Sequence, residues 1–188
     1  RNRDLYVVTT QGSGGSNSQN THNNSNVHKM HANVESYSFN DETDAMVLLA
    51  DSKLIVYYHA AAAFIEKDLL IPSMLSFDAT DYGRSAHIVA FTGNKVSIRK
   101  IDGALVIFIV ASEITLLYEL GRNSRWDECL RLCRHLKTAD ASINSDGTKV
   151  HSSASIAMWA LLAILSLSRK QLNIAELCYA ELDEVAKV

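Results

Sequence analysis

The chain arranges apolar and polar positions in two different ways, and the change between them lies near residue 112. Before this point, short apolar runs such as AMVLLA, KLIVYY, AHIVAF and ALVIFIV are separated by turn residues. The run KVSIRKI has the period of two that is typical of a half-buried strand. After this point, apolar residues recur every three or four positions, which predicts helices. The pattern therefore predicts a β-rich part followed by an α-helical part.

Two pairs of turn residues separate the last three predicted strands. The first pair is Gly93 and Asn94, and the second is Asp102 and Gly103. These residue types tolerate the positive φ that tight hairpins require. Three strands joined by two such turns predict an antiparallel meander over residues 86–110.

Four helices are predicted in the second part of the chain. The first begins at Ser112 and stops near Gly121, and the second takes Ser124 as its N-cap. The other two cover about 153–169 and 171–187, and their wide apolar stripes and small residues suit packing of helix on helix. The residues that we expect to hold the junction and the helical core together are Leu116, Leu117, Tyr118, Trp126, Leu130, Cys133, Trp159 and Leu162.

Segregated strands and helices predict two domains, with a β-rich domain at 1–111 and a helical domain at 112–188. Polar tracts interrupt both domains. The tract at about 11–32 has almost no apolar content and is predicted to be a disordered loop, and a second loop insertion is predicted at about 138–155. About six short strands cannot close a barrel or a propeller. Since the chain also opens on Arg1 and ends within a helical pattern, we expect it to be a segment of a longer polypeptide.

The composition narrows the classes of partner. The 188 residues include 18 Lys and Arg against 21 Asp and Glu, for a formal net charge of −3, so we expect no nucleic-acid partner. The longest apolar run, at 156–168, is too short to span a bilayer, so we expect no direct membrane insertion. Three cysteines do not make a disulfide framework, which favours a reducing compartment.

The helix that contains SRWDECLRLCRHLK carries the most suggestive chemistry. Cys129 and Cys133 are four residues apart on one helix face and could share a soft metal ion. His135 lies about 200° around the helix from Cys133 and adds no ligand to that face. Trp126, Leu130 and Cys133 follow the spacing of a buried stripe, and cysteine is often buried as a small apolar residue, so we favour a core role.

Other candidate sites lack their defining residues. The stretch QGSGGSNSQ has three glycines but no Gly-Lys-Ser/Thr ending for a phosphate. Ser85 and His87 are not set in the Gly-x-Ser-x-Gly turn of a hydrolase nucleophile. His22, His28 and His31 stand in the polar tract without a carboxylate or cysteine to order them. We therefore expect no catalytic residue, no cofactor and no metal site.

Four segments, taken in order along the chain, resemble a known family. RNRDL, HIVAFTGNKVSIRKIDGALV, SRWDECLRLCRHLK and IAELCYAELDEVAKV are similar to successive segments of the intraflagellar transport protein 80 family, the WD-repeat subunits of intraflagellar transport complex B. The resemblance implies two seven-bladed β-propellers followed by a TPR-like α-solenoid. This segment would hold the terminal blades of the second, WD40-like propeller and the first solenoid helices. Family members have Trp-Tyr-Tyr-Pro where this chain has Tyr57, Tyr58, His59 and Ala60, so that corner is altered.

The resemblance also implies a function. It indicates a non-enzymatic scaffold whose partners are other complex B subunits, located in the cilium or flagellum and basal body with a cytoplasmic pool. Self-association is left open. A propeller–solenoid subunit of a vesicle coat shares the architecture and is the alternative, and a thiol- or zinc-dependent enzyme is a third reading.

Overall fold

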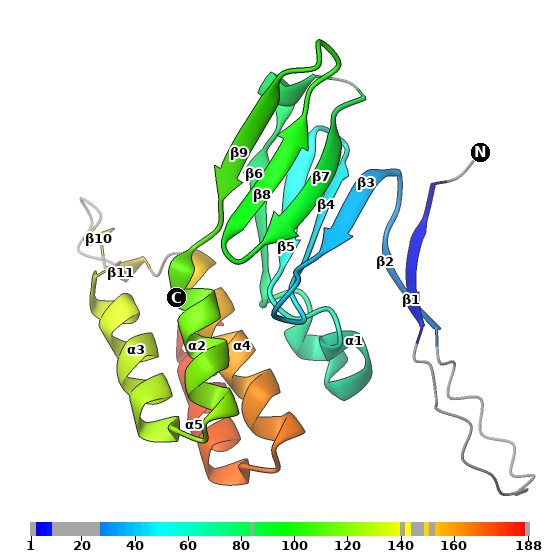
Figure 1. Ribbon diagram of the computed structural model, residues 1–188. Helices are drawn as coiled ribbons and strands as arrows, with labels where there is room; N and C mark the ends of the chain where they lie inside the picture. The colour runs from blue at the N-terminus through cyan, green and yellow to red at the C-terminus, as the bar shows by residue number, and fades with distance from the viewer. Residues whose placement is uncertain are drawn as a thin grey trace, which may run out of the picture.

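The computed structural model places strands first and helices second along the chain (Figure 1), which confirms the predicted order. The residues that the structure describes are 3–8, 27–83, 85–139, 142–143, 149–150 and 153–186. Within these residues, no helix combines the length and the apolar content needed to cross a membrane.

The first two strands correct the prediction of a disordered loop at 11–32. β2 (Val27–His31) occupies the end of that tract and pairs antiparallel with β1 (Leu5–Val8). Lys29 binds Asp4 at 2.7 Å across the pair. The prediction was wrong for β2 because it rested on the polarity of the whole tract, whereas Met30 is buried. The remainder of the tract up to residue 26 lies outside the described residues.

A four-stranded antiparallel sheet follows, in the order β3-β4-β5-β6. Its strands are β3 (Val34–Phe39), β4 (Met46–Ala50), β5 (Lys53–Tyr57) and β6 (Met74–Asp78). Asp51 and Ser52 both have positive φ, as a two-residue hairpin turn between β4 and β5 requires. Every residue of β4 is buried, which explains why its sequence reads as a continuous apolar run.

The second sheet is the predicted meander, in the order β7-β8-β9. Its strands are β7 (His87–Thr92), β8 (Lys95–Arg99) and β9 (Leu105–Ile109). Gly93 and Gly103, in the two turns, have φ values of 55° and 85°. Ala104 N–H donates to the Asp102 carboxylate at 2.9 Å, so the second turn is closed by an aspartate side chain.

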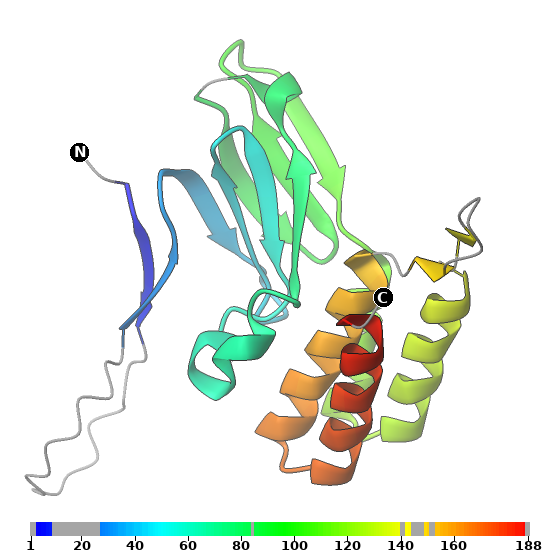
Figure 2. The ribbon, with the colours of Figure 1, turned by 180° about the vertical axis from the view of Figure 1, so that it is seen from behind.

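The two sheets lie side by side and share a core, as Figure 2 shows from behind. Ile88 N–H on β7 donates to Ser36 Oγ on β3 at 2.9 Å. On the outer strands, the rings of Phe77 and Phe108 have centroids 4.8 Å apart. These contacts join β3 to β7 and β6 to β9, so the sheets form one unit.

The link between β5 and β6 carries a short helix toward the helical part. α1 (Ala62–Ile65) is followed by the single-turn helix η1 (Lys67–Leu69), and a second single turn, η2 (Thr80–Tyr82), follows β6. Ala62 and Ala63 are buried, and α1 and η1 both contact α4. The link therefore forms part of the interface between sheets and helices.

Four helices complete the fold: α2 (Ser112–Arg122), α3 (Trp126–Ala139), α4 (Ser153–Ser168) and α5 (Leu172–Ala186). The predicted insertion at 138–155 is shorter in the structure than expected. α3 and α4 extend into it from either side, and β10 (Ser142–Ile143) pairs with β11 (Lys149–Val150) inside it. The sequence did not predict that α3 and α4 extend into the tract, because helix termini are themselves polar and resemble a loop in composition.

Both helical hairpins turn in the same way. After α2, Ser124 has a φ of 57°, and the next residue donates its N–H to the carbonyl of Leu120 at 2.9 Å. After α4, Lys170 has a φ of 59°, and the next residue donates its N–H to the carbonyl of Ser166 at 2.8 Å. These are Schellman motifs, in which a left-handed residue ends a helix. The predicted N-cap role of Ser124 is therefore wrong, because Ser124 closes α2 rather than opening α3.

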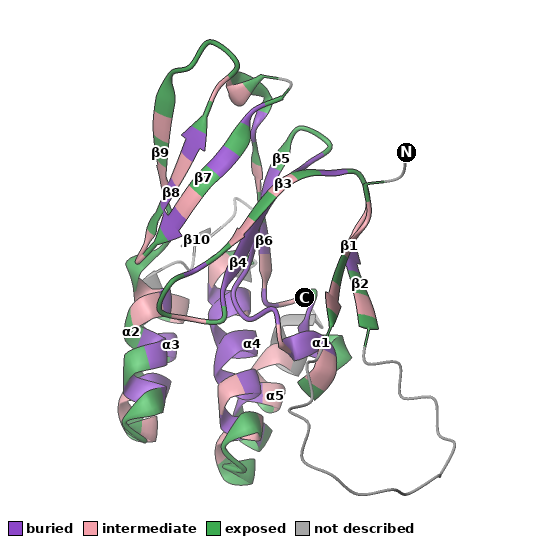
Figure 3. Cartoon of the chain, turned by 45° about the vertical axis from the view of Figure 1, so that its right-hand side comes forward, coloured by how far each residue is buried: buried purple, intermediate pink, exposed green. Residues whose placement is uncertain are grey.

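α4 lies at the centre of the helical part. It contacts α2, α3 and α5, and it also contacts α1 and β6. Figure 3 shows buried residues along β4, along α4 and on the inner sides of α2 and α3. Because α4 is apolar around its whole circumference, it can only be stable with neighbours on all sides.

Candidate functional site at the junction of sheets and helices

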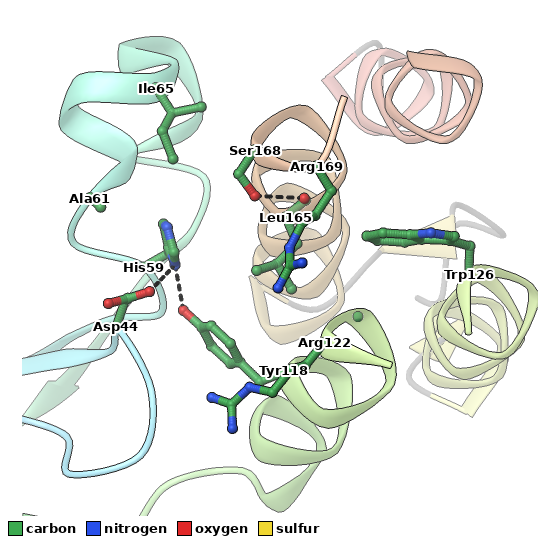
Figure 4. Close-up of a pocket in the computed structure, with 11 residues that line it drawn as sticks. Asp44, His59, Ala61, Ile65, Tyr118, Arg122, Trp126, Leu165, Ser168 and Arg169 are labelled. Carbon is green, nitrogen blue, oxygen red and sulfur yellow. Dashed lines mark hydrogen bonds and ion pairs between the residues drawn. The ribbon is translucent and has the colours of Figure 1, made fainter. Parts of the chain in front are cut away.

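A pocket of about 340 Å³ lies where the β5–α1 corner meets the helices (Figure 4). It is bordered by the loop after β3, by α1, and by α2, α3 and the end of α4. Its lining residues are Asp44, His59, Ala61, Ile65, Tyr118, Gly121, Arg122, Trp126, Leu165, Ser168 and Arg169. The pocket therefore brings charged, aromatic and aliphatic side chains from both halves of the chain together.

His59 and Tyr118 form the polar centre of this junction. The Tyr118 hydroxyl donates to the carbonyl of Tyr58 at 2.8 Å, and it lies 2.5 Å from His59 Nδ1. Since the hydroxyl hydrogen is used on the carbonyl, His59 Nδ1 must carry a hydrogen and donate it to the Tyr118 oxygen. His59 Nε2 is then the acceptor nitrogen of the neutral ring. Asp44 Oδ2 lies 3.8 Å from Nδ1 on the open side.

Burial controls the charge of these groups. It lowers the pKa of His59, and the nearby Asp44 carboxylate opposes this effect more weakly. Burial also raises the pKa of Tyr118, so the hydroxyl stays protonated. The corner therefore holds a neutral histidine and a neutral tyrosine at neutral pH.

Two arginines border the pocket from the helix ends. Arg122 Nη2, at the end of α2, donates to the carbonyl of Glu42 at 3.1 Å and so ties the helix to the β3–β4 loop. Arg169 follows α4, and Figure 4 shows its side chain in the space between His59 and Trp126. The pocket thus has a cationic side on the helices and one carboxylate, that of Asp44, on the sheet side.

A glycine and a tryptophan form the floor on the helix side. A Cβ on Gly121 would lie 3.5 Å from Leu165 Cδ1 and 3.9 Å from Trp126 Cζ3. The absence of a side chain at this position leaves room between α2 and α4. Trp126 is half-buried and presents its ring to the pocket.

The structure places the eight predicted junction and core residues in different environments. Tyr118 and Trp126 line the pocket, whereas Leu116 is 43% exposed and lies outside the core. At about 100° per residue, Leu116 lies nearly opposite the buried Ile114 on α2, so its apolar character misled the prediction. The remaining five are buried away from the pocket: Leu117, Leu130, Cys133, Trp159 and Leu162.

The predicted turn residues lie at opposite ends of the second sheet. Asn40 Nδ2 donates to the carbonyl of Gly93 at 2.8 Å, so the Gly93–Asn94 turn contacts the β3–β4 loop. The Asp102–Gly103 turn is at the far end of the same strands and is exposed. Neither turn lines the junction pocket.

The cysteines of α3 are enclosed in the helical core together with Cys178 of α5. Burial raises the pKa of Cys129 to about 11 and that of Cys178 to about 12, and it also raises the pKa of Cys133. These thiols are therefore protonated at neutral pH. His135 is exposed on α3. In the part of the chain that the structure describes, no three His, Cys, Asp or Glu side chains are grouped as a metal site.

Apart from Tyr118, the sequence did not identify the polar residues of the pocket. His59, Arg122 and Arg169 are far apart in the chain, and no spacing links them. One feature of the sequence pointed to His59: it lies in the Tyr57–Ala60 corner, where the chain departs from the family it resembles. The structure shows that this altered corner contacts α2.

Comparisons with known proteins agree with the architecture. Residues 1–112 match the family model described as IFT80 second beta-propeller. Over 188 residues the chain is 27% identical to the intraflagellar transport protein 80 homolog of Rattus norvegicus and 28% identical to that of Mus musculus. Each alignment covers 100% of this chain and 21% of the relative, so the chain spans about a fifth of the length of these curated relatives.

Proposed function

The chain belongs to the IFT80 family, and on this basis we propose that it is the joint of an intraflagellar transport subunit, where a β-propeller passes into an α-solenoid. The residues before Ser112 would be the last blades of the propeller, and those from Ser112 onward would begin the solenoid. Its role is that of a non-enzymatic scaffold, which holds binding surfaces at fixed positions.

The observation that carries this proposal is the tight connection between α2 and the sheets. Only two residues separate β9 from α2, and the helix is then fixed at two further points. Tyr118 bonds the carbonyl of Tyr58, and Arg122 bonds the carbonyl of Glu42. A helix held in this way cannot swing freely, so the helices would extend the propeller as one rigid body.

The partners and location follow from family membership. We propose that the full protein assembles with other subunits of complex B and acts in the cilium or flagellum and at the basal body, with a cytoplasmic pool. The protonated, enclosed thiols of α3 and α5 support a structural role for the cysteines over the zinc or thiol chemistry considered above.

Two neighbouring leucines on α2 provide a matched test. Leu117 is fully buried, whereas Leu116 is 43% exposed. When tagged full-length protein is purified from ciliated cells, wild type and Leu116→Asp should bring down complex B subunits to the same extent. Leu117→Asp should lose them and fail to reach the cilium, because a charge buried at the joint would break the contact of α2 with its neighbours.

Three results would contradict the proposal. Recovery of coatomer subunits without ciliary subunits would favour the vesicle-coat alternative. Equal recovery with Leu117→Asp would show that assembly does not depend on the joint. If the protein bound stoichiometric zinc and lost it on substitution of Cys129 and Cys133, the hypothesis of a thiol- or zinc-dependent enzyme would be favoured instead.

A further inference from the structure

We propose that the junction pocket is a docking site for an acidic peptide segment of another protein, in which an aspartate or glutamate carboxylate binds Arg169. The inference rests on the scaffold role proposed above and specifies the chemistry of one partner contact. Three features of the pocket support it: a cation without a partner, a histidine nitrogen that can accept a hydrogen bond, and an apolar wall.

Arg169 is the cation of this site. In Figure 4 it lies between His59 and Trp126, and within the described residues its guanidinium has no hydrogen-bond or ion-pair partner. The pocket's single lining carboxylate, Asp44, lies on the other side of His59 in the same view. A guanidinium binds a carboxylate with two parallel hydrogen bonds, which gives this position a clear preference for an acidic side chain.

Arg122 assists but is not the main anchor. One of its nitrogens is committed to the carbonyl of Glu42. It also borders a neighbouring groove, whose lining includes the acidic residues Asp41, Glu42 and Glu119. Among the residues that line the junction pocket, Asp44 alone carries a carboxylate, and it lies beyond His59, so the docking carboxylate is assigned to Arg169.

His59 supplies the second feature. The residue is only 4% exposed and lines the pocket, and its Nδ1 is occupied by the Tyr118 hydroxyl. No described residue donates to its Nε2, which is an acceptor in the neutral ring. Because His59 lines the pocket, a backbone N–H of a docked segment can donate a hydrogen bond to this nitrogen.

The remaining walls fit a side chain that neighbours the carboxylate. Ile65 of α1, Leu165 of α4 and the half-buried Trp126 of α3 face the same space. The volume of about 340 Å³ is at the lower end of the range of roughly 300–1,000 Å³ for ligand pockets. A short segment with one acidic residue beside one aliphatic residue matches this combination of charge and apolar surface.

The test uses full-length protein and three fluorescein-labelled heptapeptide libraries of Leu, Ala and Ser that differ at one position. That position is glutamate, glutamine or phosphoserine, and binding is measured by anisotropy. We expect the best glutamate peptides to bind at least ten-fold more tightly than their glutamine counterparts. Arg169→Gln should remove this preference, whereas Arg134→Gln, an exposed position on α3 outside the pocket, should leave it unchanged.

Three outcomes would overturn the inference: equal binding of the glutamate and glutamine libraries, a glutamate preference that survives Arg169→Gln, or a ten-fold preference for phosphoserine over glutamate. A parallel purification of complex B subunits with the wild-type protein separates the two proposals. Recovery of the subunits without peptide selectivity would overturn the docking site alone, and failure to recover them would overturn the scaffold role.

Discussion

His59 links the charge state of one side chain to the stability of the joint. Burial lowers the pKa of this histidine, so the folded chain resists protonation more than the unfolded chain, whose histidine has a pKa of about 6.5. Its contribution to stability is complete above pH 7. It is lost progressively as the pH falls below about 6.5 toward the lower pKa of the folded state. The free energy of unfolding should therefore decrease on mild acidification.

We expect this acid sensitivity to depend on His59 in particular. The melting temperature of the full-length protein should fall between pH 7.5 and pH 5.5, and the fall should be smaller in His59→Asn, which keeps a donor near Nδ1 but does not titrate. His87, an exposed histidine at the start of β7, provides the control. An equal fall in His59→Asn and wild type, or a reduced fall in His87→Asn, would contradict this expectation.

At this scale the sequence predicted some residues and not others for a physical reason. Cys133 lies on the periodic apolar stripe of α3, whereas Trp159 and Leu162 belong to α4, which is apolar on every side, and both patterns indicate burial. His59 and Arg169 were not recognised, because residues 110 positions apart that line one pocket leave no periodic pattern in the sequence. Leu116 shows the opposite error: it was predicted to be buried because it is apolar, but it lies on the exposed side of its helix.

At the scale of the elements, each Schellman turn holds one non-glycine residue in a strained backbone conformation that glycine would relieve. Ser124 and Lys170 hold φ values of 57° and 59°, a region that costs a residue with a Cβ about 1–2 kcal/mol. Ser124→Gly and Lys170→Gly should each raise the free energy of unfolding by up to about 1 kcal/mol, after the greater chain entropy of glycine is subtracted.

Thermal denaturation of the full-length protein would measure the gain in stability. Asn123→Gly is the matched control, because Asn123 has a φ of −87° and offers no strain to relieve. A melting temperature that rises as much with Asn123→Gly as with Ser124→Gly would show that the left-handed conformation is not the source of the effect.

Element types were easier to predict than element ends. The meander of β7 to β9 follows from alternation and turn residues, and both are local. β2 was missed because a strand of mixed polarity is defined by its pairing with β1, which lies on the far side of a long polar tract. Ser124 was assigned to the wrong helix since serine favours an N-cap, and nothing in the sequence reveals that it closes α2.

For the whole molecule, the two larger sheets differ in their number of strands. The first sheet has four strands and the second has three, and within the described residues nothing pairs with the outer edge of β9. Phe108 and Val106 point their amides toward β8, so the amides of Leu105, Ile107 and Ile109 point toward the open edge. An apolar edge of this kind is an aggregation hazard unless another strand covers it.

We therefore expect a strand from another part of the full-length polypeptide to pair with β9. Hydrogen exchange of the dilute full-length protein should show the amides of Leu105, Ile107 and Ile109 to be as protected as those of Val106 and Phe108. Protection that appears only at high concentration would indicate pairing with a second copy. Rapid exchange of these three amides at all concentrations would show that the edge stays open.

The family and the order of strands and helices were accessible from sequence because both are carried by the linear pattern. The joint between the two halves was not, since it depends on Tyr118 and Arg122 reaching the carbonyls of residues 60 and 80 positions earlier. Backbone carbonyls are present at every residue, so no side-chain pattern could mark these two acceptors.

The central position of α4 has a consequence for synthesis on the ribosome. β6, α1, α2 and α3 precede α4 in the chain and contact it, so their apolar faces stay uncovered until α4 is made. A nascent chain that pauses, or a transcript that terminates, before residue 153 would present those faces uncovered to chaperones and proteases. Quality control of this subunit would therefore depend on whether the ribosome completes one sixteen-residue helix.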